Sequence, residues 1–142
     1  MKIKTFDELN AYELYEIIKS RNEVFLLEQN IVCQDLDDVD YRAFHFFTEE
    51  EGRVTSYLRA FYTNEEKNRL KIGRVLTLNR GKGDGRRLME KAFCYFKECG
   101  AEKITVNAQT QAKGFYEKLG FKVCSDEFLE EGVPHIAMEY EL

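Results

Sequence analysis

A glycine loop between a strand-like run and a helical pattern restricts the fold of this chain most. The run KIGRVLTL, residues 71–78, has the composition of a buried strand, and apolar residues recur at helical spacing from Asp84 to Phe96. Three glycines alternate with other residues at the junction: Gly81, Gly83 and Gly85. Gly100 suits a helix C-cap, and EKITVN, residues 102–107, is strand-like. The order strand, helix, strand predicts a right-handed βαβ unit with two parallel strands.

The other segments predict one domain over residues 1–142. A first helix is expected to begin at the capping-box pair Thr5 and Glu8 and to end near residues 25–27, and a second helix is expected over residues 111–119. Four further runs are strand-like: AFHFFT and RVTSYLRAFY, which form a hairpin, and FKVCS and PHIAMEYEL near the C-terminus. This order indicates an α/β, or mixed α+β, sheet covered by helices on both faces.

Composition excludes several classes of protein. The net charge of -5 argues against broad nucleic-acid binding. No stretch approaches the roughly 18 consecutive apolar residues of a membrane span, and the N-terminus lacks the apolar core of a secretory signal. We therefore expect a cytoplasmic protein without a membrane partner. The 4 cysteines form no CxxC pair and there are only 2 histidines, so we expect no metal site and reduced, mostly buried thiols.

Positive charge gathers around the glycines, where five Lys or Arg stand against two Asp or Glu in residues 80–91. Known phosphate loops do not match: GxxxxGK[ST] is absent, and GxGxxG fails because Arg86 and Leu88 occupy the third glycine positions. The motif that remains is Arg80-x-x-Gly83-x-Gly85 at a strand-to-helix junction. A helix start has unpaired N–H groups and glycines admit a pyrophosphate, so we expect an anion there. A glycine-rich turn with solvated basic residues is the alternative.

Two motifs carry a resemblance to a known family. The stretch RGKGDGRRLM resembles the R/Q-x-x-G-x-G/A signature of the GNAT superfamily of acetyl-CoA-dependent N-acetyltransferases. The stretch NAQTQAKGFYEKLGF, residues 107–121, is similar to the second cofactor segment of that family, with an Asn ending the fifth strand and a Tyr before the Gly-Phe that opens the sixth. RNEVFLLEQN, FYEKLGF and EEGVPHIAME resemble the ElaA-like branch, so the resemblance covers nearly the whole chain.

The resemblance implies a mostly antiparallel mixed sheet whose parallel central strands splay apart around acetyl-CoA, the acetyl donor. Backbone pairing with the pantetheine would fall on Val75, Leu76 and Thr77. The residues expected around the phosphates are Arg80, Gly81, Lys82, Gly83, Asp84, Gly85 and Arg86. Asn107 would meet the cofactor amide, and Tyr116 would stand near the sulfur. Because only two residues separate this strand from Arg80, either Val75 or Thr77 can face the thioester.

The expected reaction is direct attack of a primary amine on the thioester in a ternary complex. A backbone N–H of the fourth strand would stabilise the oxyanion, and Tyr116 would protonate the departing thiolate unless it is a core aromatic. Candidate bases for the amine proton are Glu28, His45 and His135. Histidine as a residue type changes charge near neutral pH, and His135 lies where the family places substrate-facing residues, although a structural histidine is its alternative. Glu28 is otherwise a solvated acid, and His45 is expected to be a satisfied core histidine.

Several alternatives stay open at this point. The acceptor is expected to be a small-molecule or peptide amine. A non-catalytic module that binds acetyl-CoA or CoA and reports it to a partner is the second function. The acidic run QDLDDVDY, residues 34–41, either attracts a cationic amine or is a solvated loop, and we expect the loop. The apolar final strand suggests a homodimer through strand pairing.

Overall fold

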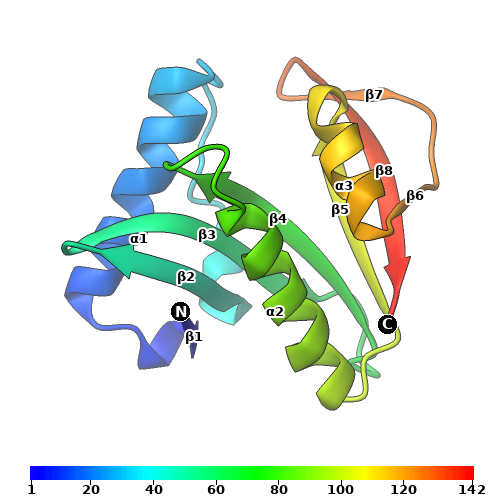
Figure 1. Cartoon of the computed structure of the whole chain (residues 1–142), viewed down its shortest axis with the longest axis horizontal. Helices are drawn as coiled ribbons and strands as arrows, with labels where there is room; N and C mark the ends of the chain where they lie inside the picture. The colour runs from blue at the N-terminus through cyan, green and yellow to red at the C-terminus, as the bar shows by residue number, and fades with distance from the viewer.

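Eight strands form one mixed sheet in the computed structural model, which describes residues 1–142 (Figure 1). The strands are β1 (Lys2–Thr5), β2 (Phe44–Glu50), β3 (Arg53–Tyr62), β4 (Arg69–Thr77), β5 (Lys103–Gln109), β6 (Lys122–Val123), β7 (Phe128–Glu130) and β8 (Val133–Glu141). Their order is β1-β2-β3-β4-β5-β8-β6, with β7 also beside β8. All neighbouring pairs are antiparallel except β4 and β5. The predicted mixed sheet with a parallel central pair is therefore confirmed.

The helices complete the element order. They are α1 (Ala11–Arg21), continued by the π-helix η2 (Asn22–Glu28), then α2 (Asp84–Glu98) and α3 (Lys113–Leu119). Three short 3-10 turns are η1 (Phe6–Glu8), η3 (Val39–Arg42) and η4 (Thr110–Ala112). The unit β4-α2-β5 is the βαβ unit that the glycine loop predicted.

The parallel strands are paired over only part of their length. β4 pairs with β5 as far as Ile72 and then diverges from it. At the same place β4 carries one extra residue relative to β3. Tyr57 of β3 faces Leu76, whereas Arg59, two residues later, faces Gly73. The bulge includes Arg74, whose φ of 54° lies in the left-handed region. Beyond the bulge, the backbone edges of β4 and β5 face an opening instead of each other.

Helices cover both faces of the sheet, as predicted, because successive side chains of a strand point to opposite faces. The larger core lies between the sheet and α2 and includes Phe46 and Leu58. The smaller core lies between the sheet and α1 and includes their neighbours Phe47 and Tyr57, with Ile17 from the helix. In Figure 1, α2 crosses in front of the sheet and α1 lies behind it.

The first helix begins later than the sequence predicted. The Glu8 carboxylate accepts hydrogen bonds from Thr5, but this pair caps the short turn η1. A second capping box, Asn10 with Glu13, starts α1 at Ala11. Burial alone would raise the pKa of Glu13, but hydrogen bonds from Asn10 and from two lysines lower it to about 2. The two boxes have the same spacing, so sequence pattern alone could not decide which one starts the long helix.

The C-terminal strands differ from the prediction in two ways. FKVCS contributes only the two-residue strand β6, and the short strand β7 was not predicted. Both strands pair with the edge of β8 that faces away from β5. The final strand is therefore already paired over these segments, and an edge-to-edge dimer through β8 is not available there.

The cysteines are not buried, contrary to the prediction. All four are exposed free thiols. Cys94, for example, lies on α2 outside the stripe that contains Leu88, Ala92 and Phe96, the side chains that the helix buries. None of the helices is long and apolar enough to cross a membrane.

Candidate active site

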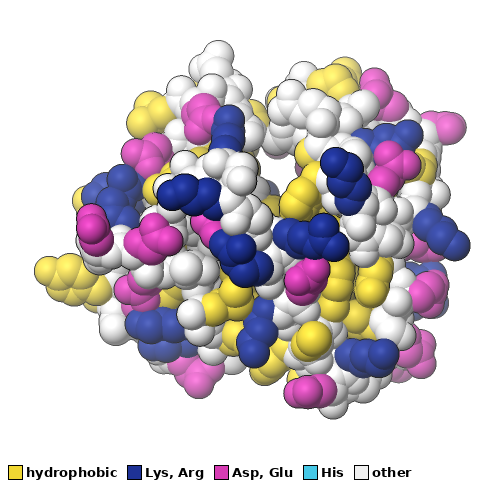
Figure 2. Space-filling view, in the orientation of Figure 1, with side chains coloured by type: hydrophobic (Ala, Val, Ile, Leu, Met, Phe, Trp, Pro, Cys, Tyr) yellow, Lys and Arg dark blue, Asp and Glu magenta, His cyan; other side chains and the backbone are white.

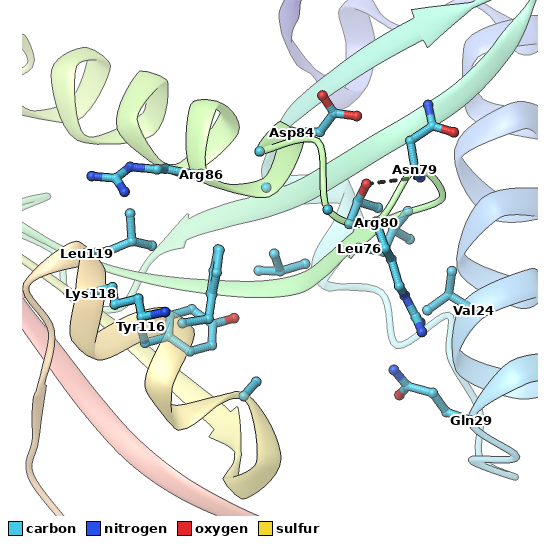
Figure 3. Close-up of a pocket in the computed structure, with 17 residues that line it drawn as sticks. Val24, Gln29, Leu76, Asn79, Arg80, Asp84, Arg86, Tyr116, Lys118 and Leu119 are labelled. Atoms are coloured by element: carbon cyan, nitrogen blue, oxygen red, sulfur yellow. Dashed lines mark hydrogen bonds between the residues drawn. The ribbon is translucent and has the colours of Figure 1, made fainter.

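A cavity of about 470 Å³ lies where β4 and β5 diverge (Figure 3). The end of β4, the glycine loop and the first turn of α2 form one wall, and α3 and η2 form the others. The lining contains every predicted cofactor-binding residue except Lys82 and Asn107. It also contains residues that the sequence analysis missed, among them Val24, Gln29, Asn79, Phe115, Lys118 and Leu119.

The glycine loop forms an open wall at the start of α2. Gly81 and Gly83 have φ values of 80° and 77°, which residues with a Cβ rarely adopt. A Cβ on Gly85 would touch the Phe115 ring at 3.4 Å, so α2 and α3 approach each other closely here. The N–H of Arg87 donates to Gly83 O at 3.1 Å, which leaves the preceding N–H groups of the first turn without helical acceptors.

Basic side chains surround the cavity mouth, as the dark-blue groups around the central hollow of Figure 2 show. Arg80, Arg86 and Lys118 belong to the lining. The Asp84 carboxylate is bound by Arg87 and points away from the cavity in Figure 3. The partial positive charge of the helix N-terminus adds to these cations. This end of the cavity therefore suits a ligand with more than one negative charge.

Glu28, a predicted base, lies at the end of η2 and forms an ion pair with Arg80. It is exposed and does not belong to the cavity lining. The pair links the glycine loop to η2 across the cavity mouth. Arg86 is likewise paired, with Glu90 one turn further along α2 at 2.9 Å.

Tyr116 brings a phenol hydroxyl to the opposite wall. Its side chain is only 7% exposed and its ring packs edge-on against Phe115 and Phe121. In Figure 3 the hydroxyl points into the cavity. Burial raises the pKa of Tyr116, so the hydroxyl stays protonated at neutral pH and is available as a donor. The ring is thus a core aromatic whose polar end reaches the cavity.

The π-helix η2 supplies the wall that sequence reasoning missed. Its wide turn is visible in the hydrogen bond from Gln29 N–H to Val24 O, five residues back, at 2.9 Å. Val24 and Gln29 both reach the cavity. The Gln29 side chain accepts a hydrogen bond from Gln109 of β5 at 2.8 Å, and Gln109 accepts one from Gln111 at 2.9 Å. This amide chain joins η2 to β5 across the separation of the strands.

Asn107 and His135 lie on the sheet face opposite α3, outside the cavity lining. On β5 the buried residues Ile104, Val106 and Ala108 belong to the core with α2 and α3, so Asn107 and Gln109 point to the other face. His135 pairs with Gln109 in the β5–β8 register and shares its face. The imidazole Nδ1 lies 2.7 Å from Val133 O.

The acidic run is not a solvated loop, which corrects the expectation. Three of its carboxylates alternate with three arginines from α1, β3 and β4 in a closed ring. The order is Arg21, Asp40, Arg59, Asp37, Arg74 and Asp35, with contacts between 2.7 and 3.5 Å. Hydrogen bonds from Arg59 lower the pKa of Asp37. The Asp40 pKa, which burial would raise, is lowered by Arg21. The partners of these acids are distant in sequence, so the run alone could not indicate them.

His45 is the satisfied core histidine that the sequence predicted. Its Nδ1 lies 2.6 Å from the Tyr57 hydroxyl and its Nε2 lies 3.0 Å from Asp40 O. The imidazole is buried beside the arginine–aspartate ring and does not belong to the cavity lining. No group of three or more His, Cys, Asp or Glu side chains is arranged to hold a metal ion.

Sequence and structure comparisons agree with this arrangement. A family model described as an acetyltransferase (GNAT) domain matches residues 19–142. The chain belongs to the GNAT acetyltransferase family. The predicted enzyme class, a GNAT-type N-acetyltransferase, is thereby confirmed, and the acyltransferase neighbours support acyl transfer as its general chemistry.

Individual relatives and solved structures match almost end to end. A UPF0039 protein of Schizosaccharomyces pombe is 33% identical, covering 98% of this chain and 95% of the relative. The structure of an acyl-CoA N-acyltransferase from Pseudomonas aeruginosa superposes with a TM-score of 0.89 at 29% identity, covering 97% of this chain and 96% of that one. Escherichia coli ElaA gives the same TM-score and coverage at 27% identity, which confirms the resemblance to the ElaA-like branch.

Proposed function

We propose that this GNAT protein transfers an acetyl group from acetyl-CoA to a primary amine by direct attack in a ternary complex. The observation that carries the proposal is the cavity itself. It places the unpaired first turn of α2 and its glycine loop at one end and the buried Tyr116 hydroxyl on the facing wall. An anion site can hold the phosphates of CoA, and a proton donor can neutralise the thiolate that leaves a CoA thioester.

The residues that line the cavity suit acetyl-CoA, the acetyl donor, in three ways. Gly81 and Gly83 have positive φ values, which favour glycine. Because glycine has no side chain, these two positions leave the phosphate end of the cavity unobstructed. Arg80, Arg86 and Lys118 supply cations there, with Lys82 exposed on the rim. The β4 edge beyond Ile72 has no strand partner on the β5 side, so the backbone of residues 75–77 is free to pair with the pantetheine amides. Acetyl-CoA, when bound, supplies an acetyl group activated as a thioester.

Val75 is the β4 residue that we assign to the thioester. Thr77 is engaged elsewhere, because its Oγ1 accepts a hydrogen bond from Asn79 N–H at 3.2 Å and so shapes the glycine loop. Val75 packs against the α2 core and lines the cavity, whereas the Leu76 side chain belongs to the α1 core. A backbone N–H at this strand end is the natural stabiliser of the oxyanion.

Two side chains move the protons in this proposal. Tyr116 donates its hydroxyl proton to the thiolate as the C–S bond breaks. His135 accepts a proton from the ammonium so that the amine can form the C–N bond, whereas Glu28 is engaged in holding Arg80. The net reaction converts an ammonium and a thioester into an amide, a thiol and one released proton.

The test is CoA-thiol release measured with and without a panel of primary amines, together with mass spectrometry of the amine. The proposal predicts thiol release that depends on the amine and an acetylated product in equal amount. Tight acetyl-CoA binding without amine-dependent release would overturn it in favour of a non-catalytic sensor of acetyl-CoA.

A further inference from the structure

Near the C-terminus, four acidic side chains form no ion pair with a Lys or Arg: Asp126, Glu127, Glu130 and Glu131. Residues 123–142 contain six Asp or Glu and no Lys or Arg. Glu139 and Glu141 bind Lys103, but the ion-pair partner of Glu130 is a histidine. The acids of the arginine–aspartate ring, in contrast, are neutralised. The β7–β8 hairpin is therefore a source of negative electrostatic potential at this end of the sheet.

His135 is a buried hydrogen-bond acceptor that faces Glu130. Its side chain is 9% exposed, and we assign the proton to Nδ1 because Nδ1 contacts Val133 O at 2.7 Å. The neutral ring then presents a lone pair at Nε2, which lies 3.5 Å from Glu130 Oε2. The Glu130 side chain is 46% exposed, so a donor that arrives from solvent can reach both the carboxylate oxygen and the ring nitrogen.

The hairpin holds Glu130 in this position. Glu131 and Gly132 have φ values of 51° and 74°, as in a two-residue type I′ turn, and Glu130 pairs with Val133 on either side of it. Asn107 Nδ2 donates to Glu130 Oε1 at 3.3 Å. The other carboxylate oxygen, Oε2, remains directed at the imidazole.

The pair lies next to the cavity wall. Gln109 is the register partner of His135 on β5, and it donates to the Gln29 side chain at 2.8 Å. Gln29 in turn lines the cavity. The chain His135, Gln109, Gln29 thus connects the acidic hairpin to the place where β4 and β5 separate, from the face opposite α3.

We propose that Glu130 and His135 together bind the ammonium group of the acceptor, and that the acceptor is a primary alkylamine without a carboxylate beside the amine. The inference rests on the proposed function and names its acceptor class. An ammonium has three N–H donors and no acceptor, so it can donate to Glu130 Oε2 and His135 Nε2 together. One of these protons passes to Nε2, which frees the nitrogen lone pair, and the imidazolium is then held by Glu130 and Val133 O. A carboxylate beside the amine would be repelled by the hairpin acids.

The direct test is NMR of protein labelled at histidine, because the chain has only 2 histidines and His45 serves as an internal reference. Ethylamine, titrated at constant pH and ionic strength, is expected to shift the His135 imidazole signals in a saturable way and to leave those of His45 unchanged. Alanine, which adds only a carboxylate to ethylamine, is expected to shift neither. Unmoved His135 signals, or equal shifts in Glu130→Gln, would overturn the inference.

The kinetic test compares two acids of the same hairpin. Glu130→Gln keeps the hydrogen bond from Asn107 and is expected to raise KM for ethylamine at least about tenfold, because hydrogen bonds to charged groups contribute at least that factor in affinity. Acetyl-CoA affinity is expected to stay the same. Glu131→Gln removes the same charge one residue away and is expected to have a smaller effect. Equal effects of the two variants would refute a specific ammonium site.

The two proposals fail in different ways. A wild-type protein without amine-dependent thiol release would refute the acetyltransferase proposal, and the NMR titration would still decide whether Glu130 and His135 bind ammonium. Amine-dependent release with an unaffected Glu130→Gln variant would leave the acetyltransferase proposal in place and refute the acceptor site.

Discussion

The two histidines of the chain differ in the groups around their ring nitrogens. His45 has a partner on each nitrogen, the Tyr57 hydroxyl and Asp40 O, and burial lowers its pKa. His135 has a carbonyl partner on Nδ1 only and turns Nε2 towards a carboxylate. The first arrangement stabilises a neutral ring in the core, and the second one leaves a lone pair for an incoming donor.

His45 gives the stability of the protein a defined pH dependence. Its pKa is lowered in the folded chain, so the unfolded chain binds a proton first as the pH falls below about 6.5. The free energy of unfolding is expected to decrease with falling pH in this range, by at most about 1.4 kcal/mol per pH unit. Urea unfolding at a series of pH values between about 7.5 and 5 measures this slope.

Histidine variants provide the control for that slope. His45→Gln is expected to lower stability at every pH and to remove most of the slope, whereas His135→Gln is expected to keep it. A His45→Gln variant with the wild-type slope would show that another group is responsible.

Tyr116 tests the proton donor of the proposed reaction. Tyr116→Phe keeps the ring contacts with Phe115 and Phe121 and removes only the hydroxyl. General acid catalysis contributes about a hundredfold to ten-thousandfold, so kcat is expected to fall by this amount while acetyl-CoA affinity and melting temperature change little.

The matched control for this variant is Tyr140→Phe, because the Tyr140 ring stacks on Phe93 at 4.1 Å and does not line the cavity. It is expected to leave kcat unchanged. If chemistry limits the rate and Tyr116→Phe also leaves kcat unchanged, Tyr116 is not the acid.

At the scale of the elements, the opening of the cavity depends on the end of β4. The bulge residue Arg74 has a positive φ, and its guanidinium binds Asp35 at 2.7 Å and Asp37 at 3.5 Å. The ring of three arginines and three aspartates therefore fastens the loop after η2 to α1, β3 and the bulge together. Strain at the bulge is compensated by these contacts.

Asp40 is the most buried acid of the ring and bridges Arg21 and Arg59. Asp40→Asn removes one partner of a buried charge network, so the free energy of unfolding is expected to fall by about 3 kcal/mol. Glu90→Gln, which removes an exposed helix pair with Arg86, is expected to change it by less than about 0.5 kcal/mol. Urea unfolding of both variants makes the comparison, and equal losses would contradict the role of the ring.

At the scale of the whole molecule, the structural features that are determined by residues close together in the sequence were predictable. The periodicity of the apolar residues and the positions of the turn residues predict the hairpin between β2 and β3, the βαβ unit and the helices on both faces. The glycine loop likewise predicted the phosphate end of the cavity from local sequence. A helix N-terminus and its glycines bind an anion through the backbone N–H groups of consecutive residues, so no contact between distant segments is needed.

Features that arise from contacts between distant segments were not predictable. Nothing in RNEVFLLEQ marks a π-helix, so Val24 and Gln29 were missed as cavity residues. The acidic run looked solvated because its arginine partners stand on three other elements. The role of Glu130 depends on the β7–β8 turn, and β7 is too short to give a strand pattern.

The central claim is that acetyl-CoA binds at the glycine loop between β4 and β5, and two glycines with the same φ value test it. Gly83 and Gly52 both have a φ of 77°, but Gly83 lines the cavity whereas Gly52 lies in the β2–β3 turn with open space around it. Valine at either position introduces similar backbone strain, so loss of stability is controlled for.

Calorimetric titration of acetyl-CoA into wild type, Gly83→Val and Gly52→Val is the deciding measurement. We expect Gly83→Val to weaken binding by more than about tenfold, a loss of about 1.4 kcal/mol, and Gly52→Val to bind as wild type does. A folded Gly83→Val variant with wild-type affinity for acetyl-CoA would contradict the assignment of this cavity.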